Sequence, residues 1–514
     1  MAKRNDLKVI FKTYDQDQPM LLPPSLEELI APNHPVRVLN AVIDKLDLST
    51  LIRTYKPGGT SSFHPRMLLK VLVYAYMNNI YSSRKIEEAV QQNVHFMWLA
   101  AMATPDHNTI NRFRSERLKE VLQKIFTQVV GMLAEEGLLS IKELYVDGTK
   151  IESAAGRYTF VWGKAIKTSK ERIKKQLDEL WAYGQKVAAV EADDTEPTDF
   201  DPITPEKITA TIASINEVLQ DKPVDPKVQA KLRYAGKNWP SKVAQYEEQE
   251  KIMGEERNSY SKTDPAATFM RMKEDHMGNG QLKPAYNVQI ATSKGYIATY
   301  SLHQKTTDTT TLIPHLAQHA ALHGTLPEVL TADAGYGSEE NYVALEGMEI
   351  TAYVKHAHFD RQQSKAIGSK KPFSTDKLFY NQQQDAYYCP MGQKMLRCGD
   401  SQRRTTTGYV QSLAVYEAKN CSGCPLRGVC HEGKGNRIVT VSHALSRLKH
   451  QADERLKSEE GILRRKQRCW DVEGVFGNIK NNHGFRRFML RGTEKVSIEV
   501  GLLALAHNLR KKAA

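Results

Sequence analysis

The sequence predicts an α/β protein with a mixed five-stranded sheet and helices, preceded by a helical domain and interrupted by two insertions. Two apolar, strand-like runs end at Asp147 and Asp333, and an alternating pattern typical of strands begins near residue 283. Helical periodicity dominates the N-terminal quarter of the chain. The expected domains are an N-terminal helical domain (1–138), a core (139–355 plus 461–514), a charged helical insertion (160–258) and a cysteine-bearing insertion (360–460).

Composition and charge favour a protein that binds a polyanion. The chain has 514 residues, 40% of them hydrophobic, and carries a formal net charge of +13. No apolar segment resembling a secretory signal follows Met1, and the apolar run 67–77 contains Lys70 and is too short to span a bilayer. We therefore expect a cytoplasmic protein that faces nucleic acid and has no membrane segment.

The first 138 residues carry several helix signals. Ser25 and Glu28 have the spacing of a capping box, and Pro65 opens a helix expected to run to about residue 80. Further helices are expected from Ser82 or Ser83 to about Leu99, and to about Glu136 after the segment 104–114, a turn that leads into a long helix. Arg112, Arg114 and Arg117 on the last helix give this pair the outline of a DNA-binding helix-turn-helix, although an ordinary helical pair with solvated arginines has the same pattern.

The core elements follow one another in the order β-β-β-α-β-α-β. The first strand and its turn are expected at 141–153, with Asp147 ending the strand and Gly148 in the turn. The remaining strands are expected at 286–291, 296–302, 328–332 and 349–354, with helices at 309–323, 338–346 and 495–510, the last of them amphipathic. Residues 164–255 are rich in Lys and Glu, and we interpret them as a helical hairpin with a flexible middle at 191–205.

A third acid lies in a basic helical stretch near the C-terminus. Val472, Val475, Phe476 and Ile479 follow helical spacing, so one face can pack inward while Glu473 and Lys480 project from roughly the same side. A surface salt bridge would explain Glu473, and turn capping would explain Asp147 and Asp333. Three acids gathered by folding would instead hold Mg²⁺, which prefers carboxylate ligands, as in phosphodiester cutting and joining.

Several motifs together resemble a DDE transposase of a bacterial insertion sequence. They are His64-Pro65-Arg66, Pro105–Arg114, Asp147-Gly148-Thr149-Lys150, Thr331–Gly337 and Asp471–Lys480. The cysteine-bearing insertion is similar to that of the group numbered eleven-eighty-two, within the transposases typified by insertion sequences four and five. The resemblance implies a ribonuclease-H-like core that binds terminal inverted repeats, cleaves DNA and transfers strands.

The resemblance also implies roles for particular residues. Asp147, Asp333 and Glu473 would be catalytic ligands of two Mg²⁺ or Mn²⁺ ions, and Lys480 would contact a phosphate of the terminal DNA. Arg468, Arg486, Arg487 and Arg491 would contact the DNA backbone, which positions DNA without reading its sequence. The family pattern has an arginine four residues before the glutamate, where this chain has Cys469, so Arg468 would serve instead.

The expected partners are double-stranded DNA, as element ends and target, and a second copy of the chain in the synaptic complex, near the bacterial nucleoid. The alternative is a transposase-derived DNA-binding protein without catalytic activity.

The cysteine-bearing insertion has the spacing of a metal site. Cys389-Pro-Met-Gly and Cys421-Ser-Gly-Cys424-Pro resemble zinc-knuckle turns, and Cys430 follows closely. Cys389, Cys421, Cys424 and Cys430 would supply the tetrahedral ligands of one structural Zn²⁺. Free, partly buried thiols are the alternative, because the first turn lacks a second cysteine until Cys398.

Overall fold

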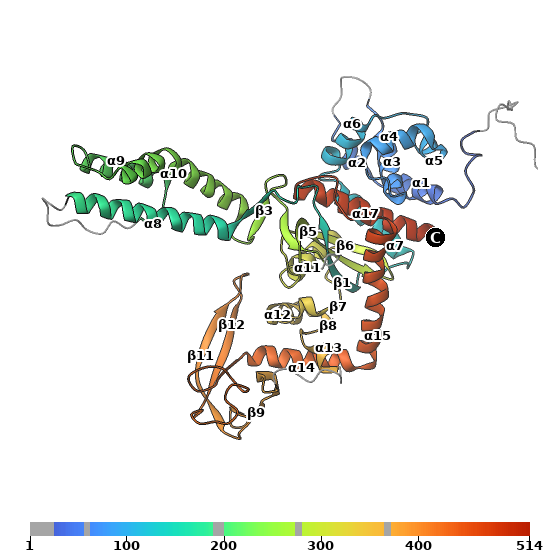
Figure 1. Ribbon diagram of the computed structural model, residues 1–514. Helices are drawn as coiled ribbons and strands as arrows, with labels where there is room; N and C mark the ends of the chain where they lie inside the picture. The colour runs from blue at the N-terminus through green and yellow to red at the C-terminus, as the bar shows by residue number, and fades with distance from the viewer. Residues whose placement is uncertain (1–24, 56–61, 189–199, 273–279, 364–371) are drawn as a thin grey trace, which may run out of the picture.

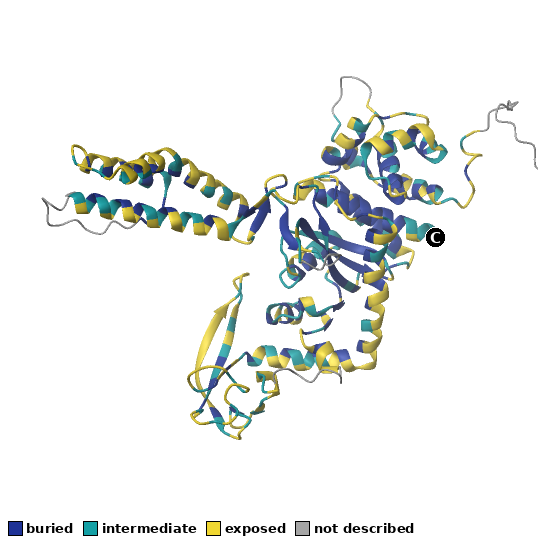
Figure 2. Ribbon diagram, viewed as in Figure 1, coloured by how far each residue is buried: buried dark blue, intermediate teal, exposed yellow. Residues whose placement is uncertain are grey.

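The computed structural model describes residues 25–55, 62–188, 200–272, 280–363 and 372–514. A sheet with helices on both faces occupies the middle of the molecule, and the N-terminal helices lie to one side of it (Figure 1). An arm of long helices and a module ending in a β-hairpin project away from the sheet. Buried residues concentrate in the sheet and on the C-terminal helix (Figure 2). None of the described helices is long and apolar enough to cross a membrane.

The N-terminal region is helical, as predicted, but its helices are shorter than expected. They are α1 (Pro35–Lys45), α2 (Ser49–Ile52), α3 (Pro65–Met77), α4 (Ser83–Gln92), α5 (Val94–Leu99), α6 (His107–Arg112) and α7 (Leu122–Glu135). The helix expected to reach Leu99 divides at Asn93, whose side chain accepts a hydrogen bond from the His95 backbone N–H and caps α5. A π-helical turn at Phe113–Arg117 separates α6 from α7.

The predicted capping box does not start a helix. Ser25 Oγ donates a hydrogen bond to Glu28 Oε1 at 3.0 Å, but these residues form only a turn. The first described helix begins at Pro35, where the His34 ring accepts a hydrogen bond from the Val36 N–H.

The central sheet has six strands, one more than predicted. They are β1 (Glu143–Glu152), β4 (Thr268–Arg271), β5 (Leu282–Ser293), β6 (Tyr296–His303), β7 (Val329–Ala332) and β8 (Thr351–Val354). β5 runs antiparallel between β1 and β6, whereas β7 and β8 run parallel to β1 on its other side. The added strand β4 pairs with the first residues of β5, beyond the end of β6. The predicted order of the other five strands and two helices is confirmed.

Asp147 does not end its strand, contrary to the prediction. β5 pairs with β1 from Tyr145 to Glu152, so the strand continues through Gly148, which therefore lies in the sheet and not in a turn. Only the parallel partner β7 stops beside Val146. The interpretation of Asp147 as the cap of a Gly148 turn is therefore wrong.

Helices cover both faces of the sheet. On one face, α11 (Leu312–His323), α12 (Glu339–Gly347) and α14 (His443–Lys457) enclose a core that includes Leu144, Val146 and Leu330. On the other face, residues of α7, of a helical segment comprising α15 (Glu459–Arg468) and α16 (Gly474–Gly477), and of α17 (Thr493–Ala513) contribute to the core.

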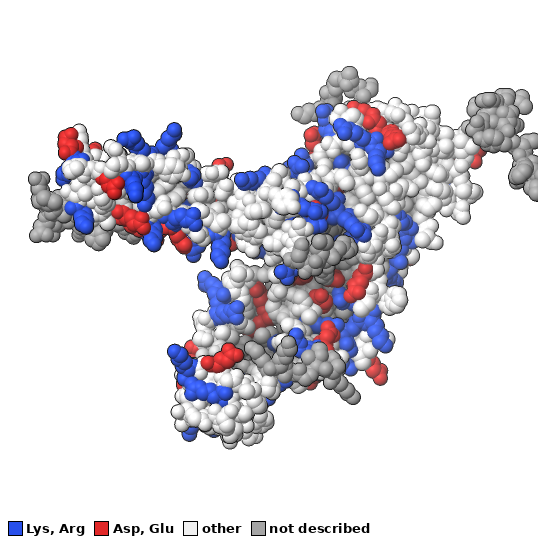
Figure 3. Space-filling model, in the orientation of Figure 1, with Lys and Arg blue, Asp and Glu red and all other residues white. Residues whose placement is uncertain are grey.

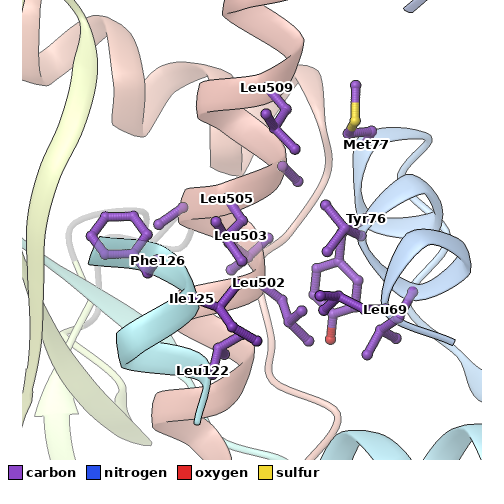
Figure 4. Packing of buried hydrophobic residues seen from close by; sticks show 14 of the residues in the cluster. Leu69, Tyr76, Met77, Leu122, Ile125, Phe126, Leu502, Leu503, Leu505 and Leu509 are labelled. Atoms are coloured by element: carbon purple, nitrogen blue, oxygen red, sulfur yellow. The ribbon is translucent and has the colours of Figure 1, made fainter. Parts of the chain in front are cut away.

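Helix α17 is buried nearly all round, so the expectation of an amphipathic helix at 495–510 is wrong. Every residue from Ile498 to Leu509 is buried. Leucines of α17 pack between α3, with Leu69 and Tyr76, and α7, with Leu122 and Phe126 (Figure 4). The helix thus joins the N-terminal helices to the sheet, because one side packs against α3 and the other against α7.

The charged insertion forms an arm of three helices on a two-stranded ribbon. They are α8 (Gly163–Ala188), α9 (Pro205–Val218) and α10 (Pro226–Met253), flanked by β2 (Phe160–Trp162) and β3 (Ser259–Ser261). The arm has its own core, which includes Leu177, Ile212 and Trp239. The prediction of two helices missed α9, and most of the expected linker at 191–205 lies outside the described residues.

The cysteine-bearing insertion contains an antiparallel sheet that the sequence pattern did not suggest. After α13 (Phe359–Gln363) come β9 (Phe379–Asn381), β10 (Ala386–Tyr388), β11 (Lys394–Arg404), β12 (Val410–Ala418) and β13 (Ile438–Val441), ordered β13-β12-β11-β10-β9. The β11–β12 hairpin contacts the core through Tyr409, whose hydroxyl donates a hydrogen bond to Glu339 Oε1 at 3.1 Å.

Candidate active site

Asp147 and Asp333 occupy equivalent positions on neighbouring parallel strands. The pairing of β1 with β7 ends at Val146 and Ala332, so the next residue on each strand is an aspartate. Asp147 is 7% exposed, and Asp333 is partly buried. The strand register therefore places two acids together at the point where these two strands separate.

Backbone N–H groups hold one oxygen of each aspartate. The Gly148 N–H donates to Asp147 Oδ1 at 2.8 Å, and the Gly335 N–H donates to Asp333 Oδ1 at 2.8 Å. The second bond closes a short turn at Ala334–Tyr336, so turn capping does apply to Asp333. Such bonds fix the orientation of a carboxylate.

Glu473 reaches this region from a helical segment with irregular winding. Residues 459–482 are helical throughout, but π-helical turns at Cys469–Glu473 and Asn478–Asn482 flank α16. Val472, Val475, Phe476 and Ile479 are buried, which confirms the predicted inward face. The Glu473 side chain is 53% exposed to solvent. π turns occur frequently at functional sites, because the wider turn redirects side chains relative to a regular helix.

Arg468 joins two of the three acids. Its Nη1 lies 3.2 Å from Asp147 Oδ2, and its Nη2 lies 3.1 Å from Glu473 Oε1. Arg468 is itself only 9% exposed. One guanidinium thus bridges carboxylates of the sheet and of the helix and offsets the repulsion between them.

The described residues include no group of three or more His, Cys, Asp or Glu side chains arranged to hold a metal ion. The position of Arg468 is consistent with this finding, because a cation already lies between Asp147 and Glu473. The donor set is nevertheless made of carboxylates, which are the ligands that Mg²⁺ prefers. A metal ion bound by both residues would therefore require Arg468 to move.

Lys480 lies further along the same helical segment, in its second π turn, and is buried with 8% exposure. Its backbone carbonyl accepts a hydrogen bond from Arg486 Nε at 3.4 Å. Because of the two π turns, the regular helical spacing from which we placed Lys480 on the side of Glu473 does not hold in this segment.

Three of the predicted DNA-contacting arginines are exposed beside the end of β1. Arg487 donates to the carbonyls of Ser153 and Ala155, and Arg491 Nε donates to the Ala154 carbonyl at 2.9 Å. Arg486, Arg487 and Arg491 thus lie on the surface, and backbone carbonyl oxygens orient all three of them. On the face shown in Figure 3, Lys and Arg side chains surround a central region where acidic side chains are visible.

The two arginines predicted in the helix-turn-helix differ in exposure. Arg112 is exposed on α6. Arg114 is only 3% exposed, and its Nη1 donates to the Tyr81 carbonyl at 2.7 Å and lies 4.0 Å from Glu499 of α17. Arg114 therefore links the N-terminal helices to α17. Because it is buried, its guanidinium does not face solvent, and the expectation that it contacts DNA is replaced by this structural role.

A buried polar network behind the two aspartates was missed at the level of sequence. Asn287 and Gln289 on β5 are fully buried, and both donate to Asp308 Oδ1, at 2.7 and 2.9 Å. The Tyr336 hydroxyl donates to Gln289 Oε1. Burial, reinforced by the charges of Asp308, Asp147 and Asp333, raises the pKa of Tyr336 well above its ordinary value. The signal in the sequence was an Asn and a Gln at alternate positions of a strand with no exposed face.

The four candidate zinc ligands line one small cavity. Cys389, Cys421, Cys424 and Cys430 surround a space of about 20 Å³, and none of them forms a disulfide. Backbone N–H groups of Gln393 and Arg437 point at the sulfurs of Cys389 and Cys421, at 3.3 and 3.4 Å. Arg437 Nη1 lies 2.7 Å from Cys430 Sγ.

Two family models match the chain. The family described as "Transposase DDE domain" matches residues 388–513, and "Transposase domain (DUF772)" matches residues 24–116. No curated protein and no solved structure matches. The first match includes Glu473 and the four cysteines, and the second includes the N-terminal helices up to α6. These matches support a DDE transposase of an insertion sequence, which is a DNA-cleaving and strand-transferring class of enzyme.

Proposed function

We propose that this protein is an active DDE transposase that binds the terminal inverted repeats of an insertion sequence, cleaves there and joins the freed 3′-hydroxyls to target DNA. The observation that carries the proposal is that Asp147 and Asp333 each follow the last paired residue of the neighbouring strands β1 and β7, with Glu473 linked to Asp147 through Arg468. The strand order β6-β5-β1-β7-β8, antiparallel in its first half and parallel in its second, supports a ribonuclease-H-like core.

Asp147, Asp333 and Glu473 would hold two divalent cations, Mg²⁺ or Mn²⁺. Bound there, the ions would activate the attacking oxygen and stabilise the leaving one. The protein contributes rigidity, because β1 and β7 fix two of the carboxylates and backbone N–H groups orient them. Arg468 holds Glu473 beside Asp147 until DNA and cations enter, and then becomes available to a DNA phosphate.

Exposed cations around the acids would bind the DNA backbone. Arg486, Arg487 and Arg491 flank the end of β1, and Arg112 extends this set to the N-terminal helices. Lys480 would contact the phosphate of the terminal DNA. Such contacts release counterions, so binding to element ends should weaken steeply as salt rises. We also propose that two copies associate when two ends are paired, in the bacterial cytoplasm near the nucleoid.

The alternative is a DNA-binding protein that has lost catalysis. The joint presence of Asp147, Asp333 and Glu473 in one region favours the active enzyme, because DNA binding alone requires no buried carboxylate beside a basic surface.

Labelled DNA carrying candidate element ends tests the proposal. The wild type is incubated with Mg²⁺, Mn²⁺ or chelator and compared with Asp147→Ala, Asp333→Ala and Glu473→Gln, and with Glu454→Gln as the control. Glu454 is exposed on α14, outside the site. We expect metal-dependent cleavage and strand transfer by the wild type and the control, and end binding without cleavage by the three site variants. Binding of authentic ends by the wild type, without cleavage under any condition, would favour the alternative.

We further propose that Cys389, Cys421, Cys424 and Cys430 bind one structural Zn²⁺. They share one small cavity, and backbone N–H groups are directed at two of the sulfurs. Arg437 would have to turn away from Cys430. Purified protein should contain one equivalent of zinc by elemental analysis. Cys421→Ser should lose it, whereas Cys398→Ser, an exposed cysteine outside the cavity, should keep it.

A further inference from the structure

We infer that a cleft between the base of the helical arm and the tip of the β11–β12 hairpin binds the sugar–phosphate backbone of one DNA strand. This inference rests on the proposed function and adds a DNA contact to it. The cleft has a volume of about 310 Å³. Most of its lining comes from the residues that follow α10, from the loop between β6 and α11, and from the hairpin tip (Figure 1).

Hydrogen bonds hold the two outer walls of the cleft in place. On the side of the arm, Arg257 Nη1 donates to the Pro265 carbonyl at 2.7 Å. At the hairpin tip, Thr407 Oγ1 donates to Glu340 Oε2 on α12 at 2.6 Å. The cleft is therefore formed before any ligand enters, which lowers the entropic cost of binding.

The loop between β6 and α11 connects the cleft to the candidate active site. Thr309 Oγ1 donates to the Gly335 carbonyl at 2.9 Å, in the short turn that follows Asp333. Asn341 Nδ2, on α12, donates to the Thr309 carbonyl at 2.8 Å and fixes the same loop. DNA that reaches Asp333 therefore also comes close to the cleft.

The lining offers hydrogen-bond donors of the kind that contact phosphate. Five of its residues are threonines, namely Thr268, Thr306, Thr307, Thr310 and Thr406. Thr268 is 1% exposed, and neither its hydroxyl nor that of Thr310 has a hydrogen-bond partner among the described residues. A buried hydroxyl without a partner is unfavourable, so an acceptor that reaches these groups is favoured. Threonine and lysine side chains commonly bind phosphate oxygens in protein–DNA complexes.

Lys305 supplies a positive charge to the cleft, and an exposed carboxylate pairs with it. Lys305 Nζ lies 3.0 Å from Glu256 Oε2, and the two side chains are 21% and 70% exposed. An ion pair with so exposed a partner contributes little to stability, so a phosphate can replace Glu256 at low cost. Glu255, the other acid of the lining, is exposed to solvent, whereas Arg257 provides a second cation.

The size and the surroundings of the cleft favour one strand of DNA as the occupant. A volume of about 310 Å³ accommodates a group of roughly nucleotide size and is too small for a double helix. Arg403 and Arg404, just before the hairpin tip, are exposed and form no ion pair with any described residue. On the face shown in Figure 3, Lys and Arg side chains lie at the free end of the hairpin. This positive surface would attract the phosphates that follow along the strand.

Binding of labelled single-stranded and duplex DNA to the full-length protein, measured by fluorescence anisotropy at several salt concentrations with chelator, tests the inference without cleavage. Lys305→Gln is compared with Lys142→Gln, because Lys142 also pairs with a glutamate, Glu328, at 2.7 Å, but outside the cleft. We expect Lys305→Gln to bind both DNAs about five- to tenfold more weakly at 50 mM salt, and to lower the salt slope by about 0.7 to 0.9. Lys142→Gln should bind like the wild type.

The partner of Lys305 gives an effect of opposite sign. Glu256→Gln releases Lys305 and should strengthen DNA binding by about twofold or more relative to Glu328→Gln, which removes the same charge elsewhere. A general effect of net charge would instead change both glutamate variants equally, and both lysine variants equally.

The outcomes separate the inference from the proposed function. DNA binding by the wild type with equal affinities and salt slopes for Lys305→Gln and Lys142→Gln would overturn the inference and leave the proposed function standing. A wild type that binds no DNA would overturn the proposed function, and the inference with it. Circular dichroism checks folding. If Lys305→Gln does not fold, Thr406→Glu, which brings a negative charge to the cleft from the exposed hairpin tip, should show the same loss.

Discussion

Replacing Arg468 with glutamine should have opposite effects on two properties of the acidic site, the stability of the fold without metal and the affinity for a divalent cation. The wild-type guanidinium contacts Asp147 at 3.2 Å and Glu473 at 3.1 Å, so any cation shared by these two acids must first displace it. Glutamine is polar but shorter than arginine and carries no charge. The variant should therefore lose stability without metal and gain affinity for a divalent cation.

The structure sets the size of both effects. Breaking the contact with Asp147, whose side chain is 10% exposed, leaves a buried carboxylate without its cation, which costs about 3–5 kcal/mol. The contact with Glu473 is half-exposed and adds at most about 1 kcal/mol. A hydrogen bond to a charged group contributes about 1.5–3 kcal/mol. In the variant, Mn²⁺ no longer has to break such a bond between Arg468 and an acid. Since 1.4 kcal/mol is a factor of ten in affinity, Arg468→Gln should bind Mn²⁺ at least about tenfold more tightly than the wild type.

Calorimetry with Mn²⁺ and thermal unfolding with and without the ion measure these effects. At a concentration of 100 times the dissociation constant, an ion stabilises the folded state by about 2.7 kcal/mol, and tenfold tighter binding raises this to about 4.1 kcal/mol. The melting temperature of Arg468→Gln should therefore start lower than that of the wild type and rise more on addition of Mn²⁺.

Arg464→Gln is the matched control, because Arg464 lies one turn earlier on α15 and pairs with Glu460 and Glu143. It should bind Mn²⁺ like the wild type. If Arg468→Gln binds the ion no more tightly than this control, Arg468 does not occupy a cation position and the reasoning fails.

Three further results are expected. Glu473→Gln should abolish strand transfer while the salt-sensitive binding of DNA ends, followed by gel shift, persists; retained joining would remove Glu473 from the site. Arg114→Met leaves Glu499 without its buried cation and should cost about 3–5 kcal/mol in denaturant unfolding, whereas the exposed Arg112→Met should change stability by less than about 0.5 kcal/mol; equal effects would refute the role of burial. Burial lowers the pKa of His319 to about 4, below its unfolded value of about 6.5, so its stabilising contribution is complete above pH 6.5 and falls by about 1.4 kcal/mol per unit as the pH drops toward 4. His319→Gln should flatten that part of the stability–pH profile, and an unchanged profile would contradict the assignment.

Many elements of the core could be predicted because the signals are local. Period-two and period-3.6 apolar patterns located the strands around Asp147 and Asp333 and the inward face beside Glu473. The aspartates were noticeable because each follows an apolar run. The end of β1 could not be predicted, since it depends on pairing with β5, which lies far along the chain.

Other residues were misjudged because burial is not a local property. Arg114 has the sequence context of a surface arginine, yet Glu499 of α17 lies opposite it and both are buried. The leucines of α17 suggested one apolar face, whereas α3 and the sheet domain bury both sides of the helix. Contacts of this kind depend on which surfaces fold together, and no window of sequence contains them.

The sequence by itself determined the order of the elements, the net positive charge and three acids at marked positions, because periodicity and residue type belong to short segments. Tertiary structure alone decided that β1 and β7 place Asp147 and Asp333 at equivalent positions, that Arg468 bridges Asp147 to Glu473, and that the buried Asn287 and Gln289 both donate to Asp308. The physical reason is that register and close approach come from long-range packing. Folding turns separate charges into one site only where it also provides the space and the hydrogen bonds that hold them.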